Sequence, residues 1–319
     1  MESISLQEVE APSASGRAVA LGAQGVIVEG AAVAGVRGRA SAYAELTKPR
    51  ITTLVMLTTA AGFFLGSRGA LSLLAFANTM IGVGLLCSGV SALNEWMERD
   101  LDALMRRTMS RPLPAGRLTP RSAFIFGLAL TVGGEAYLAL LVNPLSALCG
   151  LSVVVGYLLL YTPLKTRTSL STAVGAFPGA VPPLLGWAAA SNTVGLEAWV
   201  LFAILFLWQF PHFFAIAWMY KEDYARAGIK MLPVVEPEGR LTAQQIILWT
   251  LMLVPVSLAP AALGISGAVY FFGALVLGGL FLCTSAQAAR TLSRRNARRV
   301  LLASVLYLPF LFGLMVTKW

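Results

Sequence analysis

Long apolar runs recur along almost the whole chain, and they restrict its possible folds more than any other feature. Nine runs lie near residues 50–67, 71–93, 122–142, 144–162, 172–190, 197–219, 244–264, 267–286 and 299–317. Each approaches the roughly 20 apolar residues that a helix needs to cross a bilayer. Only 12% of the residues are charged, whereas soluble domains average about 25%. The chain is therefore predicted to be an all-α, polytopic membrane protein, with about nine transmembrane helices in one bundle.

The basic residues set the predicted orientation of this bundle. If the N-terminus is cytoplasmic, all 24 lysines and arginines except Arg68 and Lys318 lie on the cytoplasmic side. Loops on that side of membrane proteins are enriched in Lys and Arg. The formal charge of +9 is therefore explained by basic residues in the cytoplasmic loops. For this reason no nucleic-acid partner is expected.

The first forty residues do not have the pattern of a signal peptide. Glu2, Glu8 and Glu10 occupy the region that should be positively charged, and no compact apolar core follows. Residues 1–42 are predicted to form a flexible cytoplasmic N-terminal tail. Residues 43–319 are predicted to form a single membrane domain.

Three oxygen-bearing side chains follow the second apolar run at intervals of four residues. They are Asn94, Glu98 and Asp102, called the oxygen ladder below. If the helix continues past the membrane, they share one face, since four residues advance the helix by little more than one turn. Such oxygens suit a hard cation, with Mg²⁺ the first choice and Mn²⁺ also compatible. Because carboxylates at the edge of a membrane are costly, a metal site is favoured over a plain helix end.

Basic residues come directly after the oxygen ladder. Arg106, Arg107, Arg111 and Arg117 lie in a segment that Pro112, Pro114 and Gly116 exclude from regular helix. Acidic metal ligands beside arginines suggest a diphosphate site, in which the cation bridges oxygens that guanidinium groups also bind. The alternative is an interfacial loop whose arginines serve only to fix the topology.

A second group of polar residues ends the sixth run and occupies the loop after it. His212, the only histidine, lies in the run itself. A functional role is favoured over packing, because ionisable residues are expensive inside a membrane. Asp223 is a candidate second metal ligand facing the ladder, and Lys221 and Lys230 are candidates to hold phosphate oxygens.

A third, weaker patch runs from Tyr161 to Arg167 and is followed by a proline-rich span with Pro178, Pro182 and Pro183. Kinks and small residues in that span would open a lateral groove for a long apolar tail, but ordinary helix packing explains them equally well.

These segments together resemble the UbiA superfamily of intramembrane prenyltransferases, from Tyr43 onward. The resemblance rests on Leu46-Thr47-Lys48-Pro49-Arg50-Ile51, the oxygen ladder, Arg107-Thr108, Arg111-Pro112-Leu113-Pro114-Ala115-Gly116, Asp223-Tyr224 and Gly228-Ile229-Lys230-Met231-Leu232-Pro233. Within the superfamily, Trp208-Gln209-Phe210-Pro211-His212-Phe213 points to the branch that farnesylates haem. The chain departs from the usual pattern at Glu98, where Asp is more common, and it lacks a second Asp-x3-Asp.

The resemblance implies transfer of a farnesyl group from farnesyl diphosphate to the vinyl group of protohaem IX (haem B), giving haem O, with Mg-assisted ionisation of the diphosphate. It implies metal ligands at Asn94, Glu98, Asp102 and Asp223, and His212 as a haem contact or proton carrier. The implied diphosphate contacts are Lys48, Arg50, Arg106, Arg107, Arg111, Lys165, Arg167, Lys221 and Lys230.

The implied location is the bacterial cytoplasmic (inner) membrane, with the active site facing the cytoplasm. The implied partners are farnesyl diphosphate, haem B, the lipid bilayer, and a downstream haem A synthase or oxidase assembly factors. The nearest alternative is a related prenyltransferase acting on a quinone precursor or another ring acceptor. A transporter is disfavoured because transporters usually bind at the membrane midplane, and a purely structural oxidase subunit leaves the ladder unexplained.

Overall fold

The structure is a computed structural model that describes residues 36–317. Most of the predicted tail, and the last two residues, lie outside this range. The first helix, α1 (Val36–Leu46), begins before the predicted domain boundary at residue 43. Ala42 and Leu46 of α1 are fully buried in a small apolar cluster with Ala92 and Leu113.

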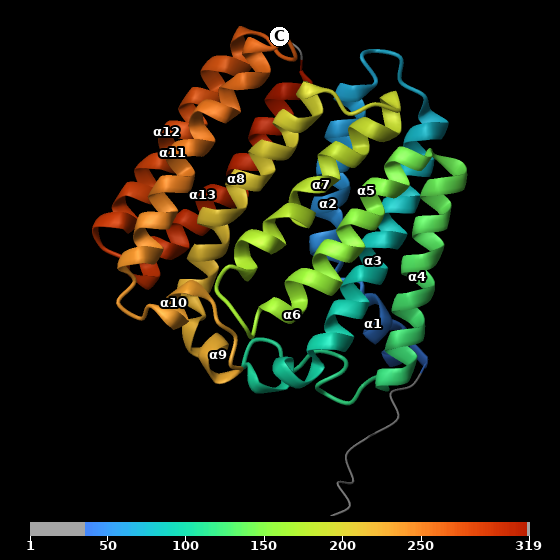
Figure 1. Cartoon of the computed structure of the whole chain (residues 1–319), viewed down its shortest axis with the longest axis vertical. Coiled ribbons are helices and arrows are strands. Elements are labelled where there is room, and N and C mark those ends of the chain that lie inside the picture. The colour runs from blue at the N-terminus through green and yellow to red at the C-terminus, as the bar shows by residue number, and fades with distance from the viewer. Residues whose placement is uncertain (1–35, 318–319) are drawn as a thin grey trace, which may run out of the picture. The chain divides into compact units, whose positions relative to one another are not determined.

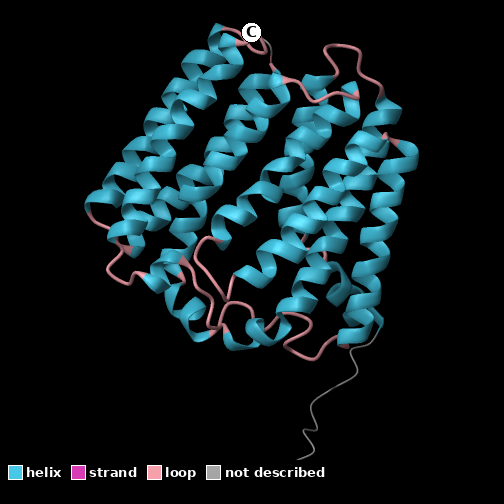
Figure 2. Cartoon of the chain, viewed as in Figure 1, coloured by secondary structure: helices cyan, strands magenta, loops and turns pink. Residues whose placement is uncertain are grey.

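Within the described residues the chain is a bundle of long helices joined by short loops (Figures 1 and 2). The long helices are α2 (Pro49–Gly66), α3 (Leu73–Leu104), α4 (Pro120–Leu141), α5 (Pro144–Val154), α7 (Ser171–Ser191), α8 (Leu196–Met219), α11 (Arg240–Ala262), α12 (Ala268–Arg290) and α13 (Arg294–Val316). The short ones are the π-helix η1 (Val155–Tyr161), α6 (Thr162–Leu164), α9 (Lys221–Arg226) and α10 (Leu232–Val235). The predicted all-α membrane fold is confirmed.

The predicted count of about nine spans is close to the observed one. Among the described residues, 8 helices are long and apolar enough to cross a membrane, with α5, η1 and α6 forming one continuous segment. The exception is α2, in which Arg50 and several threonines dilute the apolar character. Because α2 packs along α7 and α3, neighbouring helices shield part of its surface from lipid.

The centre of the bundle is made by α7 and α8, which bury a larger share of their residues than the other spans do. The backbone of α7 touches that of α2 directly. A Cβ added at Gly62 would lie 2.1 Å from the carbonyl oxygen of Pro183, and one at Gly186 would lie 2.0 Å from that of Thr59. Small residues at such crossings let membrane helices pack by close backbone approach.

Gly186→Val is expected to separate α2 from α7 and to destabilise the fold by about 3 kcal/mol or more, because a well-packed crossing cannot admit extra methyl groups. The measurement is thermal unfolding in detergent together with size-exclusion chromatography. Gly133→Val is the matched control, since a Cβ at Gly133 meets nothing within 4 Å. Equal melting temperatures for the two variants would contradict the close crossing.

The helix α3 continues well past its apolar run. Its 32 residues correspond to about 48 Å, whereas the hydrocarbon core is about 30 Å thick. The prediction that the helix carries the oxygen ladder is therefore confirmed. Asn94, Glu98 and Asp102 are only 2%, 7% and 1% exposed. The ladder lies toward the end of the bundle where α6, α9 and α10 gather, at the bottom of Figure 1.

Candidate active site

Each residue of the oxygen ladder is paired with a cationic side chain from a different part of the chain. The pairs are Lys48 Nζ with Asn94 Oδ1 at 2.9 Å, Lys165 Nζ with Glu98 Oε1 at 2.5 Å, and Arg111 Nη1 with Asp102 Oδ2 at 2.7 Å. All three cations were predicted to contact a diphosphate. The structure thus brings three of the nine predicted basic residues into direct contact with the ladder.

Lys48 lies between α1 and α2, where its backbone adopts a left-handed conformation with φ of 48°. Non-glycine residues are uncommon in this region, and they cluster at functional sites when the surrounding structure enforces them. Burial, followed by the nearby Arg111 guanidinium, lowers the pKa of Lys48 to about 8. Lys48 is therefore a cation held in a crowded, positively charged site.

Arg111 lies in the loop that follows α3. Burial acts to lower the pKa of Arg111, but the carboxylates of Asp102, Glu95 and Glu98 together outweigh burial and raise it, with Asp102 contributing most. The loop is also tied to the ladder by the Thr108 hydroxyl, which donates to the Asp102 carbonyl oxygen at 2.9 Å. The segment from Thr108 to Arg111 is thus folded back onto the last turn of α3.

The segment that carries Lys165 leaves the membrane through the π-helix η1. Within it, Thr162 accepts a hydrogen bond from Asn94 Nδ2 at 3.2 Å and donates to the Tyr157 carbonyl oxygen at 2.8 Å. Lys165 Nζ lies 4.4 Å from the centre of the Tyr161 ring. π-helical turns occur frequently at functional sites, and this one leads directly into the segment whose Thr162 hydroxyl contacts Asn94 and whose Lys165 ammonium group contacts Glu98.

Two carboxylate oxygens in this region have no hydrogen-bond partner in the described part of the chain. They are Asp102 Oδ1 and Glu95 Oε1, and both residues are 1% exposed. A buried carboxylate oxygen without a partner is costly, and native structures usually supply a partner, a water or an ion. The donor set fits a hard cation, although residues 36–317 contain no cluster of three or more His, Cys, Asp or Glu arranged as a metal site.

The second polar group docks against the end of α3. Asp223 Oδ1 accepts from Arg226 Nη1 at 3.0 Å and from the Arg106 backbone N–H at 3.4 Å. Arg107 donates to the Tyr224 hydroxyl at 3.1 Å. The structure therefore places Asp223 beside the loop after the ladder, with arginine rather than ladder partners.

The remaining predicted basic residues surround this end of the bundle. The side chains of Arg50, Arg106, Arg107, Arg167 and Lys230 are exposed, and Lys221 is half-buried. Lys221 Nζ lies 4.3 Å from the centre of the Trp218 ring. The Lys230 backbone N–H donates to the Lys165 carbonyl oxygen at 2.8 Å, which ties the two loops together.

His212 faces α13 rather than the ladder. Its Nδ1 lies 2.8 Å from Ser304 Oγ, and its ring stacks on Trp208 with 4.7 Å between ring centres. Trp208 is itself anchored, because its indole N–H donates to the Ser304 carbonyl oxygen at 2.8 Å.

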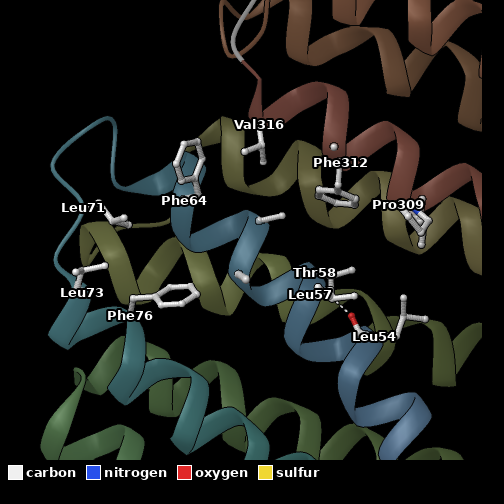
Figure 3. A pocket seen from close by; sticks show the side chains of 14 residues that line it. Leu54, Leu57, Thr58, Phe64, Leu71, Leu73, Phe76, Pro309, Phe312 and Val316 are labelled. Atoms are coloured by element: carbon white, nitrogen blue, oxygen red, sulfur yellow. Dashed lines mark hydrogen bonds between the residues drawn. The ribbon is translucent and has the colours of Figure 1, made fainter.

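An apolar pocket of about 490 Å³ opens between α2, the start of α3 and the second half of α13 (Figure 3). Its walls are Leu54, Leu57, Thr58, Ala60, Ala61, Phe64, Leu71, Leu73, Phe76, Leu308, Pro309, Phe312, Gly313 and Val316. The Thr58 hydroxyl donates to carbonyl oxygens of its own helix, at Val55 and Leu54. The pocket therefore presents almost only hydrocarbon to an occupant.

Sequence reasoning missed several residues of this site. Glu95 was not singled out, although it lies beside Asn94 and is a buried acid. Thr162 and Tyr161 belong to a weak sequence patch, in which no local signal indicates that Thr162 contacts the ladder or that Tyr161 contacts Lys165. Ser304 is a single hydroxyl within an apolar run, so only its contact with His212 reveals it.

The fold and this site define a helical membrane protein with a buried group of paired acidic and basic side chains at one end of the bundle and an apolar pocket among its helices. Residues 55–312 match the UbiA prenyltransferase family, and the chain belongs to that family. It is similar to the protoheme IX farnesyltransferase of Solibacter usitatus, with 55% identity over 283 residues that cover 86% of this chain and 97% of the relative. It is also similar to the protoheme IX farnesyltransferase of Koribacter versatilis, with 45% identity, covering 86% and 92%.

Solved structures agree on the fold. A structure described as digeranylgeranylglyceryl phosphate synthase has a TM-score of 0.74 and 17% identity, covering 88% of this chain and 98% of that one. A UbiA homologue from Archaeoglobus fulgidus bound to GPP and Mg²⁺ has a TM-score of 0.61 and 17% identity, covering 86% and 99%. The chain is thus a multi-pass membrane protein and a prenyltransferase.

Proposed function

We propose that this protein transfers the farnesyl group of farnesyl diphosphate to a vinyl group of protohaem IX, which yields haem O. The observation that carries the proposal is that each residue of the oxygen ladder contacts one cationic side chain. The choice of haem as acceptor is supported by relatives of 55% and 45% identity that bear the name protoheme IX farnesyltransferase.

The ladder residues would hold a magnesium ion shared with the diphosphate. Proteins commonly bind Mg²⁺ through one or two carboxylates plus substrate phosphates. Glu98 and Asp102 would supply two carboxylates, and the amide oxygen of Asn94 lies on the same helix face. When bound, the metal would stabilise negative charge on the leaving diphosphate. Asp223 is retained as a candidate ligand of a second ion.

The diphosphate would be bound directly by Lys48, Arg111 and Lys165. Each of them pairs with a ladder oxygen in the ligand-free structure. If those oxygens held a metal ion instead, the same cations would be free to donate to phosphate oxygens. Cations already positioned where charge develops lower the barrier to breaking the bond between farnesyl C1 and the diphosphate oxygen.

In the proposed reaction the farnesyl C1 atom leaves the diphosphate and bonds to the terminal carbon of the haem vinyl group. The positive charge then lies on the inner vinyl carbon, where water adds and loses a proton to give the hydroxyethylfarnesyl product. The surrounding helices would exclude other water from the farnesyl cation until it meets the acceptor.

The apolar pocket is the proposed place of the farnesyl chain. Leu54, at the edge of the pocket, lies on α2 six residues after Lys48. This spacing corresponds to a rise of about 9 Å, so the pocket begins close to the proposed diphosphate site. A chain of apolar carbons is favoured in a pocket that presents hydrocarbon walls.

Ala61→Trp is expected to fill the pocket and to raise the KM for farnesyl diphosphate by about tenfold or more, because a large ring would occupy volume that the chain needs. Ala61 is 9% exposed and lines the pocket. Ala139→Trp is the control, since Ala139 is exposed on α4. The check is steady-state kinetics in detergent, and an unchanged KM in Ala61→Trp would remove the pocket from the proposal.

We also propose the bacterial cytoplasmic membrane as the location, with the N-terminus and the active site on the cytoplasmic side. The distribution of Lys and Arg supports this orientation. Cysteine-accessibility labelling of a variant with one engineered cysteine beside Arg117, in intact cells and in inverted vesicles, would test it.

The proposed function is tested by expressing the protein in a strain that lacks haem O. Extracted haems are separated by chromatography and identified by mass spectrometry. Haem O is expected with the wild-type chain and not with an empty vector. If the membranes contain folded protein but no haem O, the haem acceptor is wrong and quinone precursors become the acceptors to test.

A further inference from the structure

Exposed arginines gather where α12 ends and α13 begins. They are called the arginine cluster below and comprise Arg290, Arg294, Arg295, Arg298 and Arg299. None of them forms an ion pair with any residue in the range 36–317. The sequence contains no Asp or Glu from Gly239 to Trp319. The helices that carry the cluster therefore hold no carboxylate that could neutralise it.

The cluster differs in this respect from other cations at the same end of the bundle. Arg226, for example, pairs with Asp223 at 3.0 Å. Within the described residues, the hydrogen bonds of the cluster side chains run only from Arg299 Nη1, to the amide oxygens of Gln287 at 3.2 Å and Asn296 at 3.5 Å. Each guanidinium group has five N–H donors, so most donors of the cluster remain available to an outside acceptor.

Helix α13 begins inside the cluster and adds positive charge of its own. Ser293 Oγ accepts from the Asn296 backbone N–H at 3.2 Å, and the Asn296 side chain donates to the Thr291 carbonyl oxygen at 2.8 Å. These bonds fix the start of the helix, whose first turn contains no acidic residue. The N-terminus of a helix favours anions and disfavours cations. The arginines and the helix dipole therefore both favour an anion at this place.

The arginines of α13 lie on the face that points away from the bundle. Arg295 and Arg299 are followed on that face by Leu302 and Leu306, which are 53% and 57% exposed. Val300, on the opposite face, is fully buried. Arg299 precedes Leu302 by a rise of only about 4.5 Å. The surface thus changes from guanidinium to hydrocarbon within one turn, as a bilayer changes from headgroups to acyl chains.

Helix α12 extends this surface sideways. Val276 and Leu280 are exposed and share a face with Gln287 and Arg290. Since α12 packs along α13 and Gln287 accepts from Arg299, the two exposed faces join into one. The pair lies at one edge of the bundle (Figure 1).

The cluster lies at the end of the bundle that holds the oxygen ladder, but on different helices. A Cβ added at Gly239 would lie 2.4 Å from the Trp218 ring and 3.0 Å from Leu292 Cδ2, so the turn before α13 adjoins the end of α8. The helix of the ladder, α3, packs mainly on α4, whereas α12 packs on α11 and α13. The cluster is therefore separate from the proposed diphosphate site.

We infer that the arginine cluster binds the headgroup of an anionic phospholipid whose acyl chains lie on α12 and α13. Guanidinium groups bind phosphate oxygens through paired N–H donors, and basic clusters beside a membrane helix attract anionic lipids. A zwitterionic lipid carries its own cation and would leave the charge of the cluster uncompensated. A free anion would leave the hydrocarbon face below the cluster unused.

Fixing the orientation of the chain does not by itself explain the cluster. Acidic residues contribute little to the positive-inside rule, so arginines that served orientation alone could be paired with carboxylates, as Arg226 is. The lipid site is also independent of which molecule accepts the prenyl group.

Binding is tested on the full-length protein in dodecyl maltoside, titrated with phosphatidylglycerol and with phosphatidylcholine. Native mass spectrometry measures the bound lipid, and thermal melting measures the stabilisation that a bound ligand confers. The wild type is expected to bind phosphatidylglycerol at least about tenfold more tightly than phosphatidylcholine. Only phosphatidylglycerol is expected to raise the melting temperature.

Arg295→Gln/Arg299→Gln is expected to bind phosphatidylglycerol about tenfold more weakly, with unchanged affinity for phosphatidylcholine. The matched control is Arg39→Gln/Arg121→Gln, which removes two exposed arginines of α1 and α4 and is expected to change either affinity less than about twofold. Arg295→Lys/Arg299→Lys keeps the charge but loses the paired donors, so its affinity is expected to fall between those of the wild type and the glutamine variant.

Equal affinity of the wild type for the two lipids would overturn the inference, whatever the variants do. An equal loss of phosphatidylglycerol affinity in the two glutamine variants would also overturn it, because the charge would then act without a site. Inorganic phosphate alone is the last arm. If it raises the melting temperature as much as phosphatidylglycerol does, the cluster binds a soluble anion and the lipid assignment is wrong.

Discussion

Asp102→Asn is expected to abolish measurable farnesyl transfer while the protein still folds. Asp102 combines a pair with Arg111 and a buried oxygen, Oδ1, that has no hydrogen-bond partner among residues 36–317. Asparagine keeps the shape but removes the charge that would hold a divalent cation. Loss of several kcal/mol of charge stabilisation corresponds to about 10³-fold or more in kcat/KM.

Asp100→Asn is the matched control for this prediction. Asp100 lies two residues away on the same helix, but its side chain is 84% exposed and faces Arg99 at 3.5 Å. The same chemical change there is expected to alter kcat/KM less than about twofold, since exposed ion pairs contribute little. The measurement is a farnesyl-transfer assay across a range of Mg²⁺ concentrations. Equal activity of the two variants would exclude Asp102 from the metal site.

Lys165→Met is expected to lower kcat/KM by roughly 10²–10³-fold, the usual cost of removing one donor aimed at developing negative charge. It should also lower the melting temperature, because the buried Glu98 carboxylate loses its only salt-bridge partner among the described residues. Arg121→Met, which removes an exposed cation at the start of α4, serves as the control for loss of charge alone.

The double variant Lys165→Met/Glu98→Gln separates the two roles of Lys165. Replacing both charges removes the uncompensated carboxylate, so the melting temperature is expected to return toward that of the wild type. Activity is expected to stay low, because the diphosphate still lacks Lys165 and the metal lacks Glu98. Recovery of activity together with stability would show that Lys165 only neutralises Glu98.

Much of the fold follows from short-range patterns. Each apolar run of the required length became a helix, because a chain in lipid must satisfy its backbone hydrogen bonds within the segment. The boundaries were less accurate. Hydropathy ends the second span at residue 93, yet α3 continues to Leu104, since helical hydrogen bonding does not depend on an apolar surface. The π-helix η1 was not predicted either, because its altered hydrogen bonding has no simple residue signature.

Some features of the candidate site can likewise be predicted from the sequence, whereas others cannot. That Asn94, Glu98 and Asp102 share a face follows from the order of residues alone, because four-residue spacing and helical geometry suffice for that conclusion. The membrane setting and, through the motifs, the family are also determined by the sequence. These features depend on residues close together in the chain or on composition.

Contacts across the bundle, in contrast, can be seen only in the folded chain. Lys48 and Lys165 lie 46 and 67 residues from their partners on the ladder, and His212 lies 92 residues from Ser304. The apolar pocket joins walls from α2 and α13, near opposite ends of the chain. Such contacts depend on which faces of the helices pack together. That choice is made by small local features, such as the backbone contact at Gly62 and Gly186, whose effect appears only when all the helices are in place.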